Sequence, residues 1–176
     1  MGFERIDTEE VWQGHIGGVR VDTFRYQDGS EAKREIVSHP GAVTVLPFDG
    51  ESIWLVRQPR EPVGEQSLLE LPAGKIDREG EELEQTARRE LAEEIGKGAN
   101  DWRHLVSFYN SPGILAEENH LFLAQDLYDE SLEAEEEERI EIVTVPIGDL
   151  DDTIAELKDA KTLIGLLWFR AFLRAA

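Results

Sequence analysis

Residues 70–96 have the sequence ELPAGKIDREGEELEQTARRELAEEIG, and this stretch says most about fold and chemistry. Residues three and four positions apart share one face of a helix, so Glu90, Glu93 and Glu94 gather their carboxylates on one side. Such like charges destabilise an isolated helix by about a few tenths of a kcal/mol per pair, and bound divalent cations reverse that sign. Hard cations such as Mg²⁺ take oxygen ligands and often bridge carboxylates to phosphates. The cluster therefore predicts a metal site facing a phosphate-bearing substrate; the alternative is an acidic face that is only solvated.

The flanks of this cluster favour a loop–helix–loop unit. Residues 71–74, Leu-Pro-Ala-Gly, are apolar and turn-forming, as at the end of a strand. Gly96 stands where a helix C-cap is expected, and either Arg88 or Arg89 could hold a carboxylate in place. Apolar residues recur at a spacing of four and predict a buried stripe, formed by Leu83, Ala87, Leu91 and Ile95.

The stretch resembles the signature of the Nudix hydrolases, which is Gly, five residues, Glu, seven residues, Arg-Glu, an aliphatic, any residue, Glu-Glu, any residue, Gly and an aliphatic. It departs from that signature twice. Six residues instead of five separate Gly74 from Glu81, and Lys97 stands where an aliphatic is usual. The extra residue falls in the turn-like stretch 77–80, and the spacing along the helix is intact. The positions that fit are Gly74, Glu81, Arg89, Glu90, Leu91, Glu93, Glu94 and Gly96.

Length and composition indicate one domain with a substantial core. The chain has 176 residues, of which 40% are hydrophobic. It has no cysteine, which excludes disulfides and thiol catalysis, and no apolar run approaches the ~20 residues that span a bilayer. The acidic N-terminus lacks the basic start and apolar centre of a signal peptide, so we expect a cytoplasmic location.

The formal net charge of −20 restricts the partners of this chain. Such a surface repels nucleic acid backbones and anionic lipids, so we expect neither nucleic acid nor a membrane as a partner. It would also repel a phosphorylated substrate, unless a metal ion or local arginines reverse the field at the site.

Hydrophobic patterning predicts a mixed α/β chain. The Asp28-Gly29 pair signals a hairpin, and residues 42–48 and 52–57 are expected to form the first hairpin of the core. The expected fold class is α/β, with a mixed β-sheet sandwiched between helices (α/β/α) and a small N-terminal β extension. The resemblance to the Nudix hydrolases implies that this is a Nudix fold. It also implies an extension over 1–38, used for dimerisation and as a substrate lid, and a Nudix hydrolase domain over 39–176. Strands are expected at 11–26 (one or two), 32–37, 42–48, 52–57, 67–71, 102–109, 119–124 and 139–145, and helices at 81–96, 147–157 and 161–173.

Three features resemble the ADP-ribose pyrophosphatase subfamily of the Nudix hydrolases. Residues 70–74 are similar to the segment that opens its metal motif, and Pro112 lies sixteen residues past Gly96, where that subfamily carries a proline. The N-terminal extension and the sequence His-Pro-Gly-Ala-Val at 39–43 are also similar. The resemblance implies Mg²⁺-dependent hydrolysis of ADP-ribose to AMP and ribose 5-phosphate, with Mn²⁺ as a second usable ion. It also implies a homodimer whose N-terminal extensions exchange between subunits.

The resemblance implies roles for acidic residues at the metal site. A glutamate on a loop outside the helix would act as the base or orient the attacking water, and residues 135–138 are all glutamate. Matching the following strand to the family assigns the base role to Glu136 and a further metal contact to Glu138; the alternative is a solvated acidic loop. Glu93 counts as catalytic as well as metal-binding. The implied metal ligands are Glu90, Glu93, Glu94 and the backbone carbonyl of Ala73.

The resemblance also implies the residues that bind substrate. Arg60 is similar to a phosphate-binding arginine, and Arg34 and Glu35 align with residues that recognise adenine. Glu70 is expected to contact the terminal ribose, and Pro112 belongs to the same substrate-binding set. Judged alone, each of these residues could equally be structural, and a proline in a loop is usually a turn residue.

The remaining aromatic and histidine residues have no clear site pattern. The position near Gly17 and Gly18, where the subfamily often stacks adenine, has no aromatic residue. The aromatic residues of the extension that could stack instead are Trp12, Phe24 and Tyr26. No metal-ligand spacing connects the four histidines, so we expect structural or surface roles for His15, His39, His104 and His120. A core or a dimer interface is expected for Trp168, Phe169 and Phe172.

Two alternatives to ADP-ribose hydrolysis remain at this point. The first is a Nudix hydrolase for another nucleoside diphosphate sugar, such as GDP-mannose. The second is a Nudix domain that senses nucleotide sugars without cutting them. Such domains usually lack the metal-binding glutamates, and here all three are present.

Overall fold

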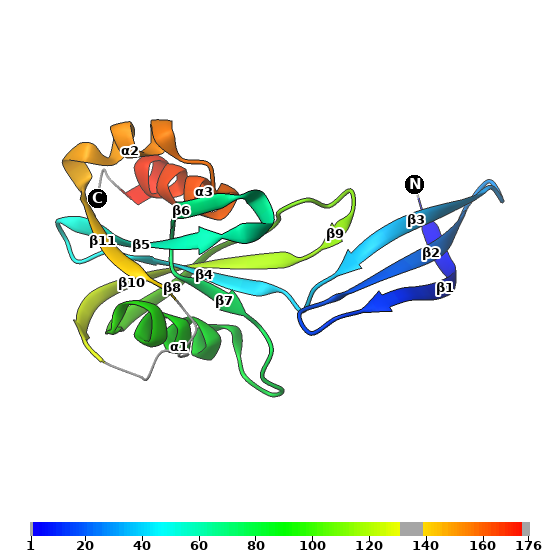
Figure 1. The fold of residues 1–176 in the computed structure, drawn as a ribbon, viewed down its shortest axis with the longest axis horizontal. Coiled ribbons are helices and arrows are strands. Elements are labelled where there is room, and N and C mark those ends of the chain that lie inside the picture. Colours follow the sequence, from blue (N-terminus) through cyan, green and yellow to red (C-terminus); the bar gives the residue numbers. More distant parts are fainter. Residues whose placement is uncertain (1, 131–138, 174–176) are drawn as a thin grey trace. The chain divides into compact units, whose positions relative to one another are not determined.

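The computed structural model of the chain describes residues 2–130 and 139–173 (Figure 1). They form two compact units. The first unit comprises Met1–Gly41 and Phe108–Glu118, and the second unit comprises Ala42–Ser107 and Asn119–Ala176.

The first unit is a small β-sheet. Strands β1 (Phe3–Gln13), β2 (Gly18–Tyr26) and β3 (Glu31–Ser38) pair antiparallel in chain order, and the short β9 (Leu115–Ala116) pairs parallel with β3. In the β2–β3 turn, the Asp28 carboxylate accepts hydrogen bonds from the main-chain N–H and the hydroxyl of Ser30. The hairpin predicted from Asp28-Gly29 is thereby confirmed.

Strand β1 begins earlier than the predicted strand at residues 11–26. Its sequence, FERIDTEEVWQ, is mostly polar, and nearly all of its residues are exposed. Apolar and polar residues therefore do not alternate clearly, and the strand is defined by its pairing with β2, where Phe3 lies opposite Tyr26.

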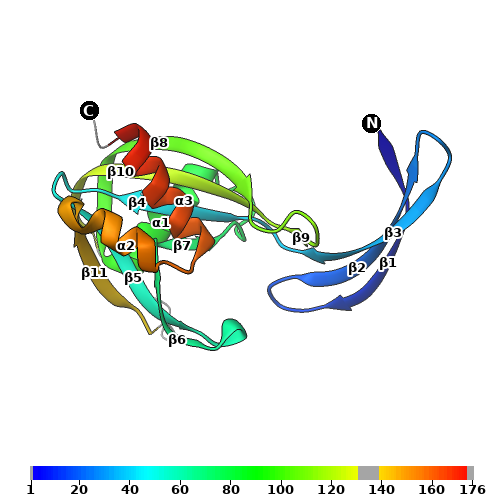
Figure 2. The same cartoon turned by 90° about the horizontal axis from the view of Figure 1, so that it is seen from above.

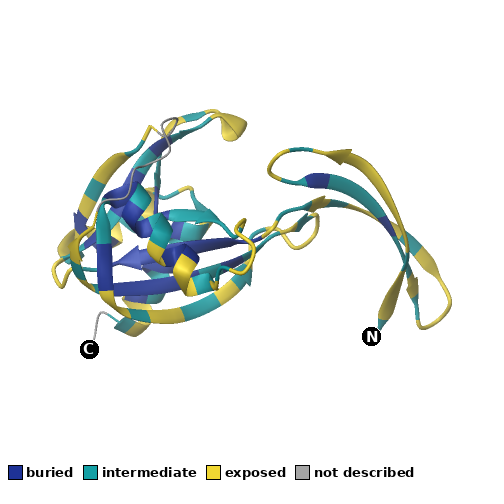
Figure 3. Ribbon diagram, turned by 90° about the horizontal axis from the view of Figure 1, so that it is seen from below, coloured by how far each residue is buried: buried dark blue, intermediate teal, exposed yellow. Residues whose placement is uncertain are grey.

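Strand β4 (Ala42–Pro47) is the centre of the second unit, and all of its residues are buried. It pairs antiparallel with β7 (Ala73–Lys75) and parallel with β10 (Glu118–Asp129), and β8 (Lys97–Tyr109) completes a sheet of order β7-β4-β10-β8. The apolar run AVTVLP fits a strand that is covered on both faces. Figure 3 shows how buried residues concentrate in the strands of this unit.

The second unit also contains an antiparallel sheet of order β11-β5-β6, formed by β11 (Glu141–Pro146), β5 (Ser52–Arg60) and β6 (Glu65–Glu70). The prediction that residues 42–48 and 52–57 form a hairpin is wrong, because only an isolated bridge between Phe48 and Ile53 joins β4 to β5. Both edges of β4 are occupied by β7 and β10, so β5 pairs with β6 and β11 instead.

Helices cover both sides of the second unit's sheets and confirm the predicted α/β/α class. Helix α1 (Leu83–Ile95) lies on one side, and α2 (Leu150–Glu156) and α3 (Ala160–Trp168) lie on the other (Figures 1 and 2). The predicted stripe on α1 packs Leu91 and Ile95 into one cluster with Val43 and Val45 of β4. Three short helical segments, Glu61–Val63, Ile147–Asp149 and Phe169–Leu173, connect or extend these elements.

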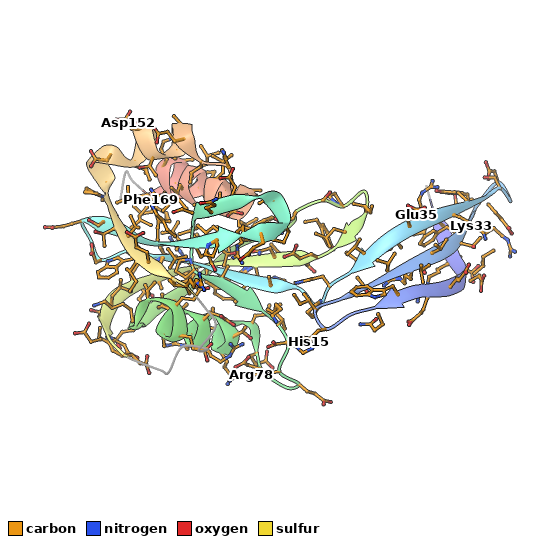
Figure 4. All side chains as sticks on the ribbon, viewed as in Figure 1. His15, Lys33, Glu35, Arg78, Asp152 and Phe169 are labelled. Carbon is orange, nitrogen blue, oxygen red and sulfur yellow. The ribbon has the colours of Figure 1, made fainter. Side chains whose placement is uncertain are left out.

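Two members of the predicted aromatic cluster on the last helix, Phe169 and Phe172, have different environments. Phe169, labelled in Figure 4, is 2% exposed and packs edge-on against Phe48, with ring centroids 4.9 Å apart. Phe172 is 66% exposed and contacts Trp168. Phe169 therefore belongs to the core, whereas Phe172 lies at the surface.

Candidate active site

The polar face of helix α1 lies against strand β7. At the N-terminus, the Glu82 N–H donates to the side chain of Gln85, which satisfies one of the donors that a helix start leaves unpaired. At the C-terminus, Gly96 has a φ of 66°, a left-handed conformation that costs most residues about 1 kcal/mol or more. The predicted cap is confirmed. Because the apolar stripe fixes the rotation of α1 on β4, the glutamates of its last turns meet the β7 segment.

Two glutamates contact the Ala73–Gly74 segment directly. The Oε2 atom of Glu94 accepts a hydrogen bond from the Ala73 N–H at 3.1 Å, and Glu94 is only 7% exposed. A β-carbon added to Gly74 would lie 1.9 Å from the carboxyl carbon of Glu90, so the Glu90 carboxylate lies directly against the glycine backbone. Both glutamates therefore meet the segment whose carbonyl was predicted as a metal ligand.

Arg89 connects the other glutamates of the motif. Its Nη1 atom donates to Glu90 at 2.6 Å and to Glu93 at 3.0 Å, and Nε and Nη2 both donate to Glu81 at 3.3 Å. Burial alone would lower the pKa of Arg89, but the bonds and charges of these carboxylates raise it above its ordinary value. Burial likewise opposes ionisation of Glu81, and its hydrogen bonds from Arg89 and Thr86 nevertheless lower its pKa. Arg89 is therefore a fixed cation that holds three motif carboxylates.

The carboxylates around Arg89 outnumber the cations, and this excess suits a divalent metal ion. Three cations, Lys75, Arg78 and Arg89, pair with acidic groups here, and Figure 4 places Arg78 on the loop before α1. The ligand atoms that these carboxylates could supply are all oxygens, which fits hard ions such as Mg²⁺ and Mn²⁺ rather than metals that prefer nitrogen or sulfur. Across residues 2–130 and 139–173, no three His, Cys, Asp or Glu side chains are already arranged to hold an ion. The acidic groups concerned are Asp77, Glu81, Glu90, Glu93 and Glu94.

Two residues that were predicted separately to bind substrate contact each other. Arg60, at the end of β5, donates from Nε and Nη2 to the two carboxylate oxygens of Glu70, at 2.6 and 2.9 Å. Glu70, at the end of β6, is 1% exposed. The hydrogen bonds that Arg60 donates to Glu70 are the main cause that raises the pKa of Arg60, and the charge of Glu94 raises it further. Arg60 therefore lies within the electrostatic reach of Glu94, one of the predicted metal ligands.

In the first unit, two other predicted residues line one cavity of about 370 Å³. Arg34 donates to the hydroxyl of Tyr26 at 3.2 Å, and Pro112 lies on the same cavity wall. Glu35 does not line this cavity; it follows Arg34 on β3 and lies with Lys33 beside a neighbouring hollow (Figure 4). The aromatic residues of the cavity are Phe3, Phe24 and Tyr26.

Phe3 also lines this cavity, although no sequence pattern predicted it, whereas the exposed Trp12 does not. Phe3 contacts Phe24 with ring centroids 5.3 Å apart, a contact that follows from the β1–β2 register. The predicted base, Glu136, and the further metal contact, Glu138, lie outside the described residues.

Both departures from the Nudix signature are accommodated locally. The extra residue lies in the turn before α1, where the Glu81 N–H donates to the Arg78 carbonyl at 3.2 Å. Lys97 lies over the ring of Trp54, 4.7 Å from its centroid, and pairs with Asp129. Its aliphatic stem thus covers apolar surface while its charge is paired.

Two of the four histidines, His104 and His120, lie close together in the structure although they are far apart in the sequence. His104 and His120 bracket the hydroxyl of Ser107, with N–O distances of 3.1 and 2.7 Å. The other two lie elsewhere in the chain: His15 is exposed, and His39 accepts a hydrogen bond from the Gly41 N–H. In the part of the chain that the structure describes, none of the helices has the length and apolar composition to cross a bilayer.

Comparison with known proteins identifies the family. Residues 38–164 match the NUDIX domain. Over 170 residues, which cover 94% of this chain, the sequence is 38% identical to the ADP-ribose pyrophosphatase of Bacillus subtilis (strain 168), covering 91% of it. It is 36% identical, with the same two coverages, to the methanol dehydrogenase activator of Bacillus methanolicus. The crystal structure of an ADP compounds hydrolase superposes with a TM-score of 0.86 and 26% identity, over 99% of this chain and 96% of that one.

The chain belongs to the Nudix family, which confirms the resemblance drawn from its motif, and it is an enzyme of the hydrolase class. Glu90 and Glu94, two of the positions that fit the family signature, lie against β7 in this structure.

Substituting Gly74→Ala is expected to lower hydrolase activity by about 10- to 100-fold, because the new methyl group displaces the Glu90 carboxylate. The free energy of unfolding should change by less than about 1 kcal/mol, since only the flexible end of a glutamate has to move. Urea unfolding and steady-state kinetics measure the two effects. The control is Gly148→Ala, where an added β-carbon has no neighbour within 4 Å. Full activity in the Gly74→Ala variant would contradict the assigned contact.

Proposed function

We propose that this enzyme hydrolyses the diphosphate bond of ADP-ribose to AMP and ribose 5-phosphate, with Mg²⁺ as the physiological ion and Mn²⁺ as a substitute. The observation that carries the proposal is the contact of Glu90 and Glu94 with the Ala73–Gly74 segment, within electrostatic reach of Arg60. A relative named ADP-ribose pyrophosphatase that matches almost the whole chain supports the choice of substrate.

The proposed roles follow the chemistry of the described groups. Glu90, Glu93, Glu94 and the Ala73 carbonyl hold the metal, which when bound neutralises the diphosphate and acidifies a water molecule. Arg60 donates hydrogen bonds to a phosphate oxygen, from the guanidinium edge that Glu70 does not occupy.

One P–O bond to the bridging oxygen breaks as a water oxygen bonds to the same phosphorus, and the proton of the water passes to a carboxylate. For that role we propose Glu136, with Glu138 as a further metal contact. Such a mechanism needs no covalent enzyme intermediate.

Adenine recognition is assigned to the first unit in this proposal. Arg34 and Glu35 recognise the base, Arg34 from the cavity of about 370 Å³ and Glu35 from the hollow next to it, and Pro112 belongs to the same substrate-binding set. Phe24 or Tyr26 provides a ring face beside Arg34 in that cavity. The cavity is lined by apolar and aromatic groups together with two arginines, which suits a flat base more than a sugar.

A panel of nucleotide sugars tests the substrate assignment. With Mg²⁺, ADP-ribose is expected to have the highest kcat/KM, with AMP as the nucleotide product, and EDTA should abolish turnover. Chromatographic measurement of the released monophosphate distinguishes ADP-ribose from GDP-mannose and ADP-glucose. A competitor that exceeds ADP-ribose by more than about tenfold in kcat/KM would replace it as the substrate.

Substituting Glu94→Gln is expected to lower kcat by at least about two orders of magnitude, because a neutral amide is a poor ligand for Mg²⁺. The amide oxygen can still accept the Ala73 N–H, so the fold should persist. The matched control is Glu84→Gln on the same helix, which removes only an exposed pair with Arg88. A Glu94→Gln enzyme within about threefold of the wild type would instead favour a domain that senses nucleotide sugars.

The proposal includes a homodimer in which residues 1–38 serve for dimerisation and as a lid over the substrate, and residues 39–176 form the catalytic domain. Four large apolar side chains of the first unit are at least 59% exposed, namely Phe3, Val11, Trp12 and Ile16. Such a concentration on one small sheet is typical of an interaction surface.

Light scattering of the wild type is expected to give twice the chain mass of 19.9 kDa. The double substitution Val11→Glu and Trp12→Glu should shift the mass to one chain, because it places charges in the apolar interface. Val63→Glu, at a 70% exposed position of the second unit, is the control and should leave the mass unchanged. A wild type that has the mass of one chain at tens of micromolar would refute the dimer.

A further inference from the structure

The N-terminus of α3 carries a cluster of paired charges that the sequence analysis did not connect with the site. Lys161 pairs with Glu70 at 3.5 Å and with Asp159 at 2.9 Å. Glu70 in turn makes the two-point contact with Arg60. The cluster therefore alternates in charge from Asp159 through Lys161 and Glu70 to Arg60, and Glu70, which is 1% exposed, is its most buried member.

A second contact joins the start of α3 to Leu71, the residue that follows Glu70. The Leu71 N–H donates to the hydroxyl of Thr162 at 2.8 Å, and Thr162 donates from that hydroxyl and from its main-chain N–H to Asp159. Asp159 is thus the N-cap of α3 and also the anchor of the Leu71 main chain. The start of α3 therefore holds both the Glu70 side chain and the Leu71 backbone, directly before the Ala73–Gly74 segment.

The burial of Glu70 explains why it needs more than one cation. A buried carboxylate loses its hydration, and the loss is offset only when charged donors surround it. Burial also opposes the ionisation of Asp159, but Lys161 and Thr162 lower its pKa below the ordinary value. Asp159 is therefore ionised at neutral pH and keeps the Lys161 ammonium in place between two carboxylates.

We propose that Lys161, held by Asp159, is a positioning residue that fixes Glu70 and thereby orients the guanidinium of Arg60 toward the substrate diphosphate. The inference rests on the proposed role of Arg60 as a phosphate-binding residue. Arg60 is 39% exposed, and its Nε and Nη2 atoms are engaged by Glu70. This contact fixes the plane of the guanidinium and directs its other edge, which includes Nη1, toward an incoming ligand.

The geometry favours this role over direct binding of substrate by Lys161. The Lys161 side chain is only 18% exposed and already serves two carboxylates, whereas Arg60 is about twice as exposed. Preorganisation of this kind lowers the conformational cost of binding a ligand. A variant that loses it is therefore expected to have a higher KM and a nearly unchanged kcat.

The test compares Lys161→Met with Lys161→Arg. Lys161→Met is expected to raise KM for ADP-ribose about tenfold with kcat within about threefold of the wild type, and Lys161→Arg should restore most of the affinity. Lys158→Met is the matched control, because Lys158 is 69% exposed and pairs with Glu65 near the same helix. Asp159→Asn, which weakens the anchor and keeps a capping group, should raise KM less and serves if Lys161→Met does not fold.

The Arg60→Ala background separates this inference from the proposed function. If Lys161 acts through Arg60, Lys161→Met has no further effect on KM once Arg60 is removed. An equal rise in KM in both backgrounds would show that Lys161 acts by another route and would overturn the inference. If Arg60→Ala leaves KM unchanged, the phosphate-binding role of Arg60 fails, and the positioning role falls with it.

A measurement without substrate keeps the inference testable whatever the enzyme hydrolyses. The Nε–H signal of Arg60 in an NMR spectrum should exchange slowly with water in the wild type and in Lys161→Arg, and about tenfold or more faster in Lys161→Met. Thermal unfolding of the same variants controls for global stability. An Arg60 signal that is unchanged in a folded Lys161→Met protein would overturn the positioning role, and a lowered Tm with unchanged KM would assign Lys161 to stability alone.

Discussion

The hydrogen bond from the Ala73 amide to the Glu94 carboxylate is the contact on which the geometry of the site depends. It joins helix α1 to strand β7 across a buried boundary, where an unpaired amide or carboxylate would cost about 1–3 kcal/mol or more. Next to Glu94 on the buried side of the helix, Leu91 and Ile95 pack in one cluster with Val43 and Val45 of β4, the strand that pairs with β7. Apolar packing therefore sets the position of the helix, and the hydrogen bond sets the position of the carboxylate.

Buried arginine–carboxylate pairs recur around this contact and organise a very acidic chain. Arg89 binds Glu81, Glu90 and Glu93, whereas Arg60 pairs only with Glu70 among residues 2–130 and 139–173. The first arginine lies among several acids and leaves an excess of negative charge for a cation. The second has one acidic partner, so its remaining donors can serve an anion. In the proposed reaction, Arg89 would serve the metal end and Arg60 the diphosphate end of the bound complex.

The first unit contributes a different kind of surface. Its sheet has few buried residues, and its cavity combines aromatic rings with Arg20 and Arg34. Asp22 is one of its buried residues, and Arg5 and Arg20 both pair with it, so the small sheet is stabilised partly by charge. A sheet that buries so little apolar surface is marginal by itself, which is consistent with the dimer proposed above.

The sequence by itself determined the features that depend on near neighbours along the chain. The α1 helix, its buried stripe, its glycine cap, the Asp28 turn and the motif glutamates follow from spacings of two to eight residues, which local geometry controls. Tertiary structure alone decided that β4 and β5 belong to different sheets and that Glu70 meets both Arg60 and Lys161. The Leu71–Thr162 bond spans 91 positions. Pairings over such distances depend on which edges and faces remain available after the core has packed, and no local pattern encodes that outcome.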